Sequence, residues 1–222
     1  MLAATAHLAI CISSKANPTL MKKLLIATNN PHKLEEYREI LADLPLTITS
    51  LSEEGIDLDP EETGTTFVAN AILKAEAFAQ ESHLLTLADD SGLEVDALNG
   101  EPGVYSARYE DTAKDDHVGR YQLVLDKLIA KNVPWTERTG RFRCVVALAT
   151  QEGLIGTAEG AVEGYIAYEP KGQNGFGYDP VFYFPEFDQT LAEVSAAQKH
   201  TVSHRGRAAR AAIPLIEAYL RR

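Results

Sequence analysis

Two adjacent acids follow an apolar run in the middle of the chain. The stretch TLADDSGL covers residues 86–93 and places Asp89 and Asp90 beside Ser91. Neighbouring side chains on an extended backbone point to opposite faces, so the two carboxylates should have different surroundings and different tasks. Mg²⁺ takes oxygen ligands and often uses one or two carboxylates together with substrate phosphates. The stretch fits a metal-binding acid with a supporting partner, and it also fits a solvated Asx-type turn.

A second stretch, TNNPHK at residues 28–33, joins the end of an apolar strand to the start of a helix. Backbone N–H groups and the positive end of the helix dipole at such a junction can bind an anion. Lys33 in the first helical turn opposes that dipole, and a bound phosphate would explain its position. An ordinary helix capped by Asn30, with a solvated lysine, is the alternative.

Three further segments offer chemistry of a less specific kind. EETG at 61–64 carries Glu62 just before a helical pattern in which Lys74 shares a stripe with apolar residues. GFGYDP at 175–180 holds two aromatic rings in a loop loosened by glycines, and such rings can stack on a nucleobase. Lys199 and SHRG at 203–206 supply directed donors near a helix start. Each segment also fits a plain structural role: an acidic turn, an aromatic loop packed on its own domain, or a basic helix start.

The elements that must position these residues alternate between strand and helix. The apolar patterns predict strands at 23–28, 84–88, 140–150, 153–167 and 180–184. They predict helices at 31–41, 65–80 and 118–131, a short helix capped by Thr190 and Glu193, and a last helix from Ser203 that Pro214 should kink. Because two of the strands form a long antiparallel hairpin, the expected fold is α/β: an elongated, two-lobed mixed sheet flanked by helices, with the active-site cleft between the lobes.

The composition limits the possible partners and compartments. The 222 residues carry a formal net charge of −11, which disfavours binding to nucleic acid because phosphates would be repelled. The two cysteines, Cys11 and Cys144, have no disulfide-framework or metal-site spacing, so a reducing, cytoplasmic location is expected. No run is apolar enough for a membrane span. We expect a loosely ordered extension over 1–20, a natural start at Met21, and one domain over 21–222.

Together these motifs resemble one family, the pyrophosphatases of non-standard purine nucleoside triphosphates, also called inosine triphosphate pyrophosphatases. The resemblance runs from Lys22 to Leu220. It is carried by the ordered set TxNxxK at 28–33, EETG at 61–64, TFxxNAxxKA at 66–75, ADDSGLEVDAL at 88–98, GVYSARY at 103–109, FGYDPVF at 176–182 and SHRG at 203–206. Each motif is weak alone, and the ordered set is specific.

The resemblance implies an activity and a set of site residues. It implies a homodimer that uses Mg²⁺ to hydrolyse ITP, dITP and XTP to the monophosphate and pyrophosphate, which clears deaminated purines from the nucleotide pool. Asp90 matches the proton acceptor, and Glu62 and Asp90 match the metal-binding acids. The substrate-binding positions that the family implies are Thr28, Asn29, Asn30, Pro31, His32, Lys33, Lys74, Ser91, Phe176, Gly177, Tyr178, Asp179, Lys199, His204 and Arg205.

Two features depart from the family pattern, and three rival functions remain. The family often has a glutamate where this chain has Ala69, and it assigns no role to residues 1–20. The rivals are a related pyrophosphatase of modified pyrimidine nucleotides, a non-catalytic nucleotide sensor and a general phosphatase. The FGYD and SHRG segments argue against the first rival, and the intact acids argue against the second.

Overall fold

One mixed sheet organises the part of the chain that the computed structural model describes, residues 21–113 and 115–222. Within it the seven-stranded order is β2-β1-β3-β4-β5-β6-β7. β1 pairs in parallel with β2 and β3, and all later pairs are antiparallel. The strands are β1 (Lys23–Ile26), β2 (Thr47–Ser50), β3 (Leu85–Val95), β4 (Thr139–Thr150), β5 (Gly153–Ile166), β6 (Phe182–Phe184) and β7 (Gln189–Thr190). The predicted mixed α/β sheet is confirmed.

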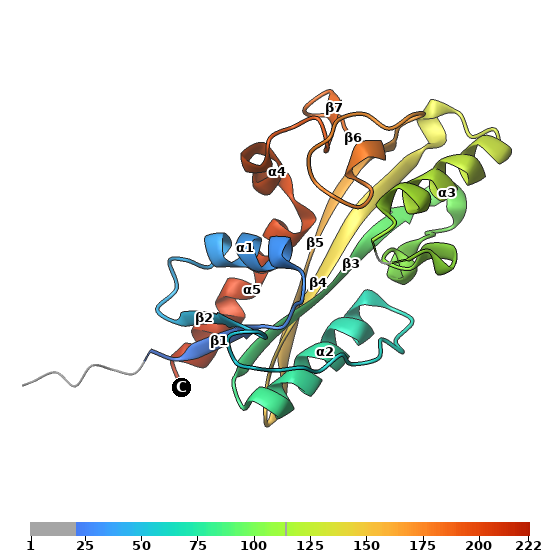
Figure 1. Cartoon of the computed structure of the whole chain (residues 1–222). Coiled ribbons are helices and arrows are strands. Elements are labelled where there is room, and N and C mark those ends of the chain that lie inside the picture. The colour runs from blue at the N-terminus through green and yellow to red at the C-terminus, as the bar shows by residue number, and fades with distance from the viewer. Residues whose placement is uncertain (1–20, 114) are drawn as a thin grey trace, which may run out of the picture.

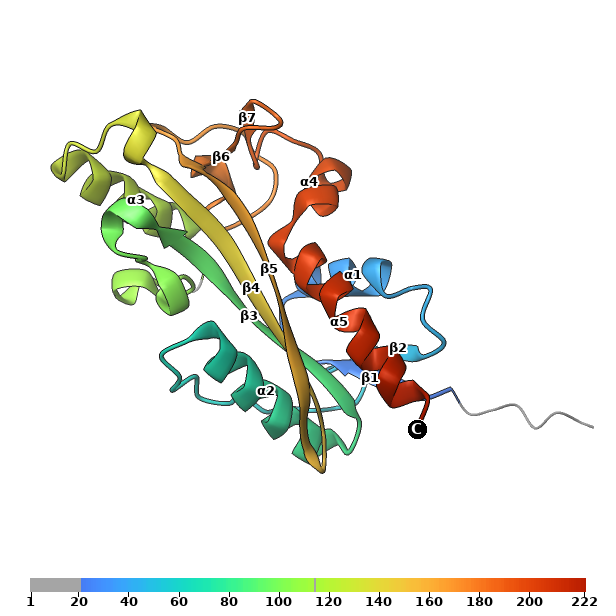
Figure 2. The same cartoon turned by 180° about the vertical axis from the view of Figure 1, so that it is seen from behind.

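Helices cover both faces of the long strands (Figures 1 and 2). α1 (Pro31–Ile40) and α5 (His204–Leu220) lie on one side, and α2 (Phe67–Ser82) lies on the other. α3 (His117–Ala130) and α4 (Ala196–Val202) belong to the far half of the molecule, which the long strands β3, β4 and β5 also enter. The two halves therefore share strands, as the predicted two-lobed shape requires.

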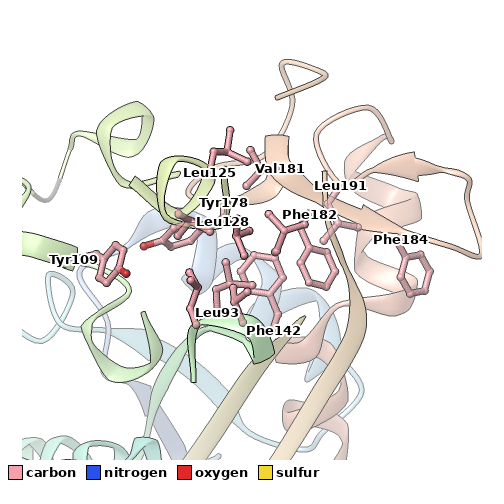
Figure 3. Close-up of a cluster of buried hydrophobic side chains, with 14 of the residues drawn as sticks. Leu93, Tyr109, Leu125, Leu128, Phe142, Tyr178, Val181, Phe182, Phe184 and Leu191 are labelled. Atoms are coloured by element: carbon pink, nitrogen blue, oxygen red, sulfur yellow. The ribbon is translucent and has the colours of Figure 1, made fainter. Parts of the chain in front are cut away.

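Alternation along β3 and β4 divides the core. Leu85, Leu87, Cys144 and Val146 pack with α1 and α5, whereas Ala88 and Val145 pack with Phe67 and Ala71 of α2. Further along the first face, a third cluster fills the far half, where Leu93 and Phe142 meet Tyr178 and Phe182 (Figure 3). This period of two is the reason that consecutive residues of β3 face different surroundings.

The structure differs from the sequence prediction in three elements. β3 does not end at Ala88 but continues through both acids to Val95, held by a ladder to β4 that pairs Asp89 with Val146 and Asp90 with Val145. β2, a strand of four residues, was not predicted. The longer β3 arises because pairing with β4 overrides the weak strand propensity of Asp, Ser and Gly, whereas β2 is a short Thr-Ile-Thr-Ser segment that pairs with β1.

The third difference is the capping box. The Glu193 carboxylate accepts a hydrogen bond from the Thr190 N–H, but no helix begins at Thr190, because Thr190 is in β7 and its hydroxyl donates to the Lys171 carbonyl. The capping box instead joins Ser195 and Gln198 at the start of α4. The last helix does begin after Ser203 and continues through Pro214, as predicted, while the expectation of a kink there stays a prediction. The predicted extension over 1–20 lies outside the described residues.

Candidate active site

The site forms where β1 stops and β3 continues. β1 pairs with β3 only from Leu24 to Ile26, opposite Leu85 to Leu87. Beyond that point β3 keeps its partner β4 on one edge, and the chain leaving β1 turns through 28–30 into α1. Ligands of α/β sheets bind outside the carboxyl ends of parallel strands, and Asp89 to Ser91 lie just past this end.

Asp89 is the centre of a buried charge cluster on the α1 and α5 face. Its Oδ2 accepts a hydrogen bond from Lys33 Nζ at 2.8 Å and lies 3.5 Å from Arg205 Nε and 3.7 Å from Cys144 Sγ. Burial alone would raise the pKa of Asp89, but the charges of Lys33 and Arg205 outweigh burial and hold that pKa well below its usual range. Asp89 is therefore an ionised anchor for two cations.

Asp90 faces the opposite side, toward α2. Its Oδ1 accepts a hydrogen bond from Lys74 Nζ at 3.1 Å, and its Oδ2 accepts one from Asn70 Nδ2 at 3.1 Å. Burial has the largest effect on Asp90 and, with the nearby charge of Glu62, raises its pKa despite the opposing charge of Lys74. The two neighbouring acids thus have pKa values shifted in opposite directions, an arrangement that is common in catalytic sites.

Lys74 joins Asp90 to the turn that precedes α2. Its ammonium also donates to Glu62 Oε1 at 2.6 Å, so one cation contacts both predicted metal ligands. Burial lowers the pKa of Lys74, but the charges of Asp90, Asp89 and Glu62 raise that pKa by more than burial lowers it. The net shift is upward. The helical stripe predicted from sequence therefore does carry a lysine inward to acids.

The start of α1 is capped from within. Asn30 Oδ1 accepts the N–H groups of His32 and Lys33, and Thr28 Oγ1 accepts the N–H of Asn30. The predicted cap is confirmed, and in this structure Asp89 explains the lysine that opposes the dipole. Pro31 occupies the first helical position, and Asn29 is exposed beside it.

The glycine-rich loop separates its two aromatic rings. Tyr178 is buried in the far-half core and donates its hydroxyl to the Ser106 carbonyl, whereas Phe176 is partly exposed. Phe176 stacks on His32 with ring centroids 5.9 Å apart, and the ammonium of Lys199 lies 4.7 Å from the centroid of the Phe176 ring. Phe176 is thus the ring of this pair that a planar ligand can reach.

Asp179 fixes the shape of this loop. Its Oδ2 accepts the N–H of Phe176 at 2.7 Å and the ammonium of Lys199 at 2.5 Å. A Cβ on Gly175 would come within 2.2 Å of the same oxygen, and the φ of Gly175 is +73°. Gly177 also has a positive φ, +64°. The glycines let the backbone fold around Asp179 and leave Phe176 at the surface.

The first residues of α5 complete the cluster. Arg205 is 3% exposed and donates to Glu36 Oε2 at 2.9 Å and to Ser91 Oγ at 3.3 Å. His204 stacks on Phe142, and burial, together with the charge of Arg205, lowers its pKa well below the usual value, so its imidazole is neutral. The segments predicted from 28–33, 89–91, 176–179 and 199–205 therefore meet in one place.

Known proteins resemble this chain over most of its length. Residues 24–215 match the Ham1 family. The chain is 48% identical to the dITP/XTP pyrophosphatase of Desulforamulus reducens, covering 87% of this chain and 95% of that protein. It is 46% identical to the dITP/XTP pyrophosphatase of Bacillus subtilis, covering 90% of this chain and 99% of that protein.

This chain belongs to the Ham1 family.

Solved structures of other Ham1 proteins have the same fold. The HAM1 protein from Coxiella burnetii superposes with a TM-score of 0.81 at 40% identity and covers 89% of this chain and 100% of its own. The Staphylococcus aureus Ham1 protein superposes with a TM-score of 0.76 at 43% identity, with coverages of 90% and 98%. The family resemblance drawn from the motifs is confirmed.

The acids of this Ham1 protein suit a hard divalent cation. Among residues 21–113 and 115–222, no group of three or more His, Cys, Asp and Glu side chains is arranged to hold a metal. Glu62 and Asp90 nevertheless lie close enough to share one ammonium, and two carboxylates with substrate phosphates are a usual Mg²⁺ donor set. The residues present therefore fit a divalent cation that Glu62 and Asp90 hold and that the nucleotide phosphates coordinate further.

Sequence reasoning missed three residues of the Ham1 site. Asn70 contacts Asp90, Arg108 donates to Glu62 Oε2 at 3.0 Å, and Glu36 holds Arg205 and accepts the Ser203 hydroxyl. Asn70 could have been found, because it precedes Lys74 by four residues and shares its helix face. Arg108 belongs to the GVYSARY stretch at 103–109, but nothing local pairs it with Glu62. Glu36 carries no local signal, because its partner Arg205 lies far away in the chain.

The described part of the Ham1 chain also bears on membrane association. None of the helices in residues 21–113 and 115–222 has the length and apolar character needed to cross a membrane.

Proposed function

We propose that this protein is a nucleoside triphosphate pyrophosphatase that hydrolyses dITP, ITP and XTP to the monophosphate and pyrophosphate. The observation that carries the proposal is the single lysine that contacts both Glu62 and Asp90 beside a second, Asp89-bound lysine. That arrangement supplies two carboxylates for a cation and two ammonium groups for a triphosphate. Relatives named dITP/XTP pyrophosphatase, 43–48% identical to this chain, support the purine substrate over a pyrimidine one.

Glu62 and Asp90 would hold Mg²⁺ together with the phosphates. When bound, the cation supplies charge neutralisation at the phosphates and lowers the pKa of a coordinated water. Asp90 combines a raised pKa with a place next to the proposed cation, so we assign it the proton of the attacking water. Attack at the α-phosphorus would break the bond to the bridging α–β oxygen, and pyrophosphate would leave.

Lys33 and Lys74 would stabilise the departing pyrophosphate. Each ammonium is partly buried and bound to a carboxylate in this structure, so each is already oriented before a nucleotide arrives. Fixed cations in a site of low dielectric stabilise developing charge more than solvated ones do. We place Thr28, Asn29, Asn30, Pro31 and His32 along the same phosphates.

The base would lie against Phe176, with Gly177, Tyr178 and Asp179 shaping the loop beneath it. Arg205 has five N–H donors in a fixed fork, held by Glu36 and in contact with Ser91. A 6-keto oxygen can accept from such a donor, whereas the 6-amino group of adenine would oppose one donor with another. Lys199 and the neutral His204 complete the proposed base site.

The test is product analysis with the full-length protein. dITP, XTP, ITP, dATP and a modified pyrimidine triphosphate are each incubated with and without Mg²⁺, and pyrophosphate and orthophosphate are quantified separately. We expect pyrophosphate from the deaminated purines and loss of turnover in EDTA. Orthophosphate as the product would indicate a general phosphatase, binding without turnover a sensor, and preference for the pyrimidine the rival pyrophosphatase. We also propose that the protein is a cytoplasmic homodimer. Light scattering, which measures the mass of the particle in solution, would test the dimer.

A further inference from the structure

Asn70 is a fully buried amide in the first turns of α2. Its side chain has 0% exposure, so an unpaired amide there would be costly. Both ends are paired: Oδ1 accepts the N–H of Gly64 at 2.8 Å, and Nδ2 donates to Asp90 Oδ2 at 3.1 Å. The opposite orientation would place an oxygen against the carboxylate and an NH₂ against an N–H, so only one orientation of the amide fits.

Asn70 and Lys74 both donate hydrogen bonds to Asp90 from the same face of α2. They are four residues apart, which places them side by side on α2. Asn70 donates to Oδ2 and Lys74 donates to Oδ1, so each oxygen of the carboxylate has its own donor. This fixes the rotation of the carboxylate about its last bond. Lys74 would turn toward phosphate once a nucleotide arrives, whereas the neutral amide has no reason to leave.

The same amide anchors the turn that carries Glu62. Gly64 lies two residues after Glu62, and its N–H bonds to Asn70. The approach is close: a Cβ added to Gly64 would lie 2.5 Å from Asn70 Oδ1 and 2.8 Å from the Ala69 Cβ. One side chain therefore contacts Asp90 directly and the Glu62 turn through its backbone.

We infer that Asn70 is a positioning residue that sets the separation and orientation of Glu62 and Asp90 for a divalent cation. The inference rests on the proposed function, because it assigns the metal to these two acids. Removing the amide frees the Asp90 carboxylate to rotate and releases the 61–64 turn. Removing a group that orients metal ligands typically costs about 10–100-fold in metal affinity or activity.

The test compares Asn70→Ala and Gly64→Ala with the wild type and with Gln80→Ala. Gln80 is on the same helix, where its amide donates to the Gln151 carbonyl at 2.7 Å, so Gln80→Ala removes one amide hydrogen bond far from the acids. Mn²⁺ binding without nucleotide is measured by calorimetry and by electron paramagnetic resonance. Thermal unfolding, and kcat and KM for dITP at saturating Mg²⁺, are measured alongside.

We expect Asn70→Ala to weaken Mn²⁺ binding and lower kcat by about 10–100-fold each, with KM for dITP at saturating metal within about twofold of wild type. Gly64→Ala should give the same pattern, because its methyl group displaces the Asn70 side chain while leaving it in the sequence. Gln80→Ala should match the wild type. If Asn70→Ala does not fold, Gly64→Ala and Asn70→Ser decide the question.

Wild-type Mn²⁺ affinity in folded Asn70 and Gly64 variants would overturn the inference, even if their melting temperatures fall. That result would mean that the amide only stabilises the fold. The proposed function fails separately, if the wild type releases no pyrophosphate from dITP. Because Mn²⁺ binding is read without nucleotide, the two failures are distinguishable.

Discussion

Asp89→Asn and Asp90→Asn should have opposite phenotypes although the two acids are neighbours. Asp89 is 4% exposed and contacts the ammonium of Lys33 and the guanidinium of Arg205. Removing one partner of a buried ion pair costs about 3–5 kcal/mol, and an isosteric amide that keeps its oxygen should fall at the lower end. We therefore expect Asp89→Asn to lose about 3 kcal/mol at pH 7, which lowers the melting temperature by about 6–12 °C in a chain of this size.

Asp90→Asn should leave stability within about 1 kcal/mol of wild type, because a raised pKa means that folding disfavours the ionised carboxylate. Lys74 also keeps Glu62 as a partner in that variant. Turnover of dITP should nevertheless be abolished, while nucleotide binding stays measurable. Asp89→Asn should be far less damaging to turnover in the protein that remains folded.

The assay is urea unfolding followed by the fluorescence of Trp135, repeated from pH 8 to pH 3, with dITP turnover measured at pH 7. The folded pKa of Asp89 is below its unfolded value of about 3.9, so its contribution is present above that pH and is lost as the pH falls below it. The gap between wild type and Asp89→Asn should be constant from pH 8 to 5 and shrink below pH of about 4. Equal stability at pH 7, or a larger loss in Asp90→Asn than in Asp89→Asn, would refute this reasoning.

Three further predictions concern Lys74, His204 and a close contact between β5 and α5. Lys74→Ala should lower kcat/KM for dITP by about 100-fold while the dITP/dATP preference changes little, because the lysine is assigned to phosphates; steady-state kinetics that moved only the preference would contradict that assignment. His204→Phe should remove a pH dependence of the free energy of unfolding. Because the pKa of His204 is lowered in the folded state, the wild type loses about 1.4 kcal/mol per pH unit below a pH of about 6.5. If the free energy of unfolding in urea changed equally with pH in both proteins between pH 6 and 5, that would argue against a neutral buried imidazole. Gly160→Ala should destabilise the protein by about 1–3 kcal/mol, because its Cβ would lie 2.5 Å from backbone atoms of His204 and Ala208; an unchanged melting temperature would show that α5 can shift.

Local patterns predicted most of the elements but misjudged the strand that matters most. The apolar run ending at Ala88 predicts a buried strand. Residue propensities place the end of that strand at Ala88, because Asp-Asp-Ser-Gly disfavours strand. The strand continues because β4 supplies hydrogen bonds to it as far as Val95. Its two carboxylates are tolerated because Lys33 and Lys74 reach them from helices on opposite faces.

The divergence of Asp89 and Asp90 was predictable from a period of two, and it is confirmed. Which acid faced which cation was not, because the choice depends on the tertiary placement of α1, α2 and α5. Arg205 shows the same limit: its motif marks a helix start, but its partner Glu36 is 169 residues earlier. A place for Asn70 beside Lys74 could have been predicted from helical periodicity, because the two residues are four positions apart.

The long strands also decide how this molecule can move. β3 pairs with β4 from Thr86–Ala149 to Val95–Gly140, and β4 pairs with β5 along nearly its whole length. Hinged closure needs a few loop residues between two bodies that can absorb a large rotation. Here the two halves are connected by three paired strands and not by a loop hinge, so a rotation of one half against the other has to be absorbed as bending or twisting of those strands. The turn at 61–64 and the loop at 171–178 lie outside these strands, so they can adjust to a ligand without changing the strand ladders.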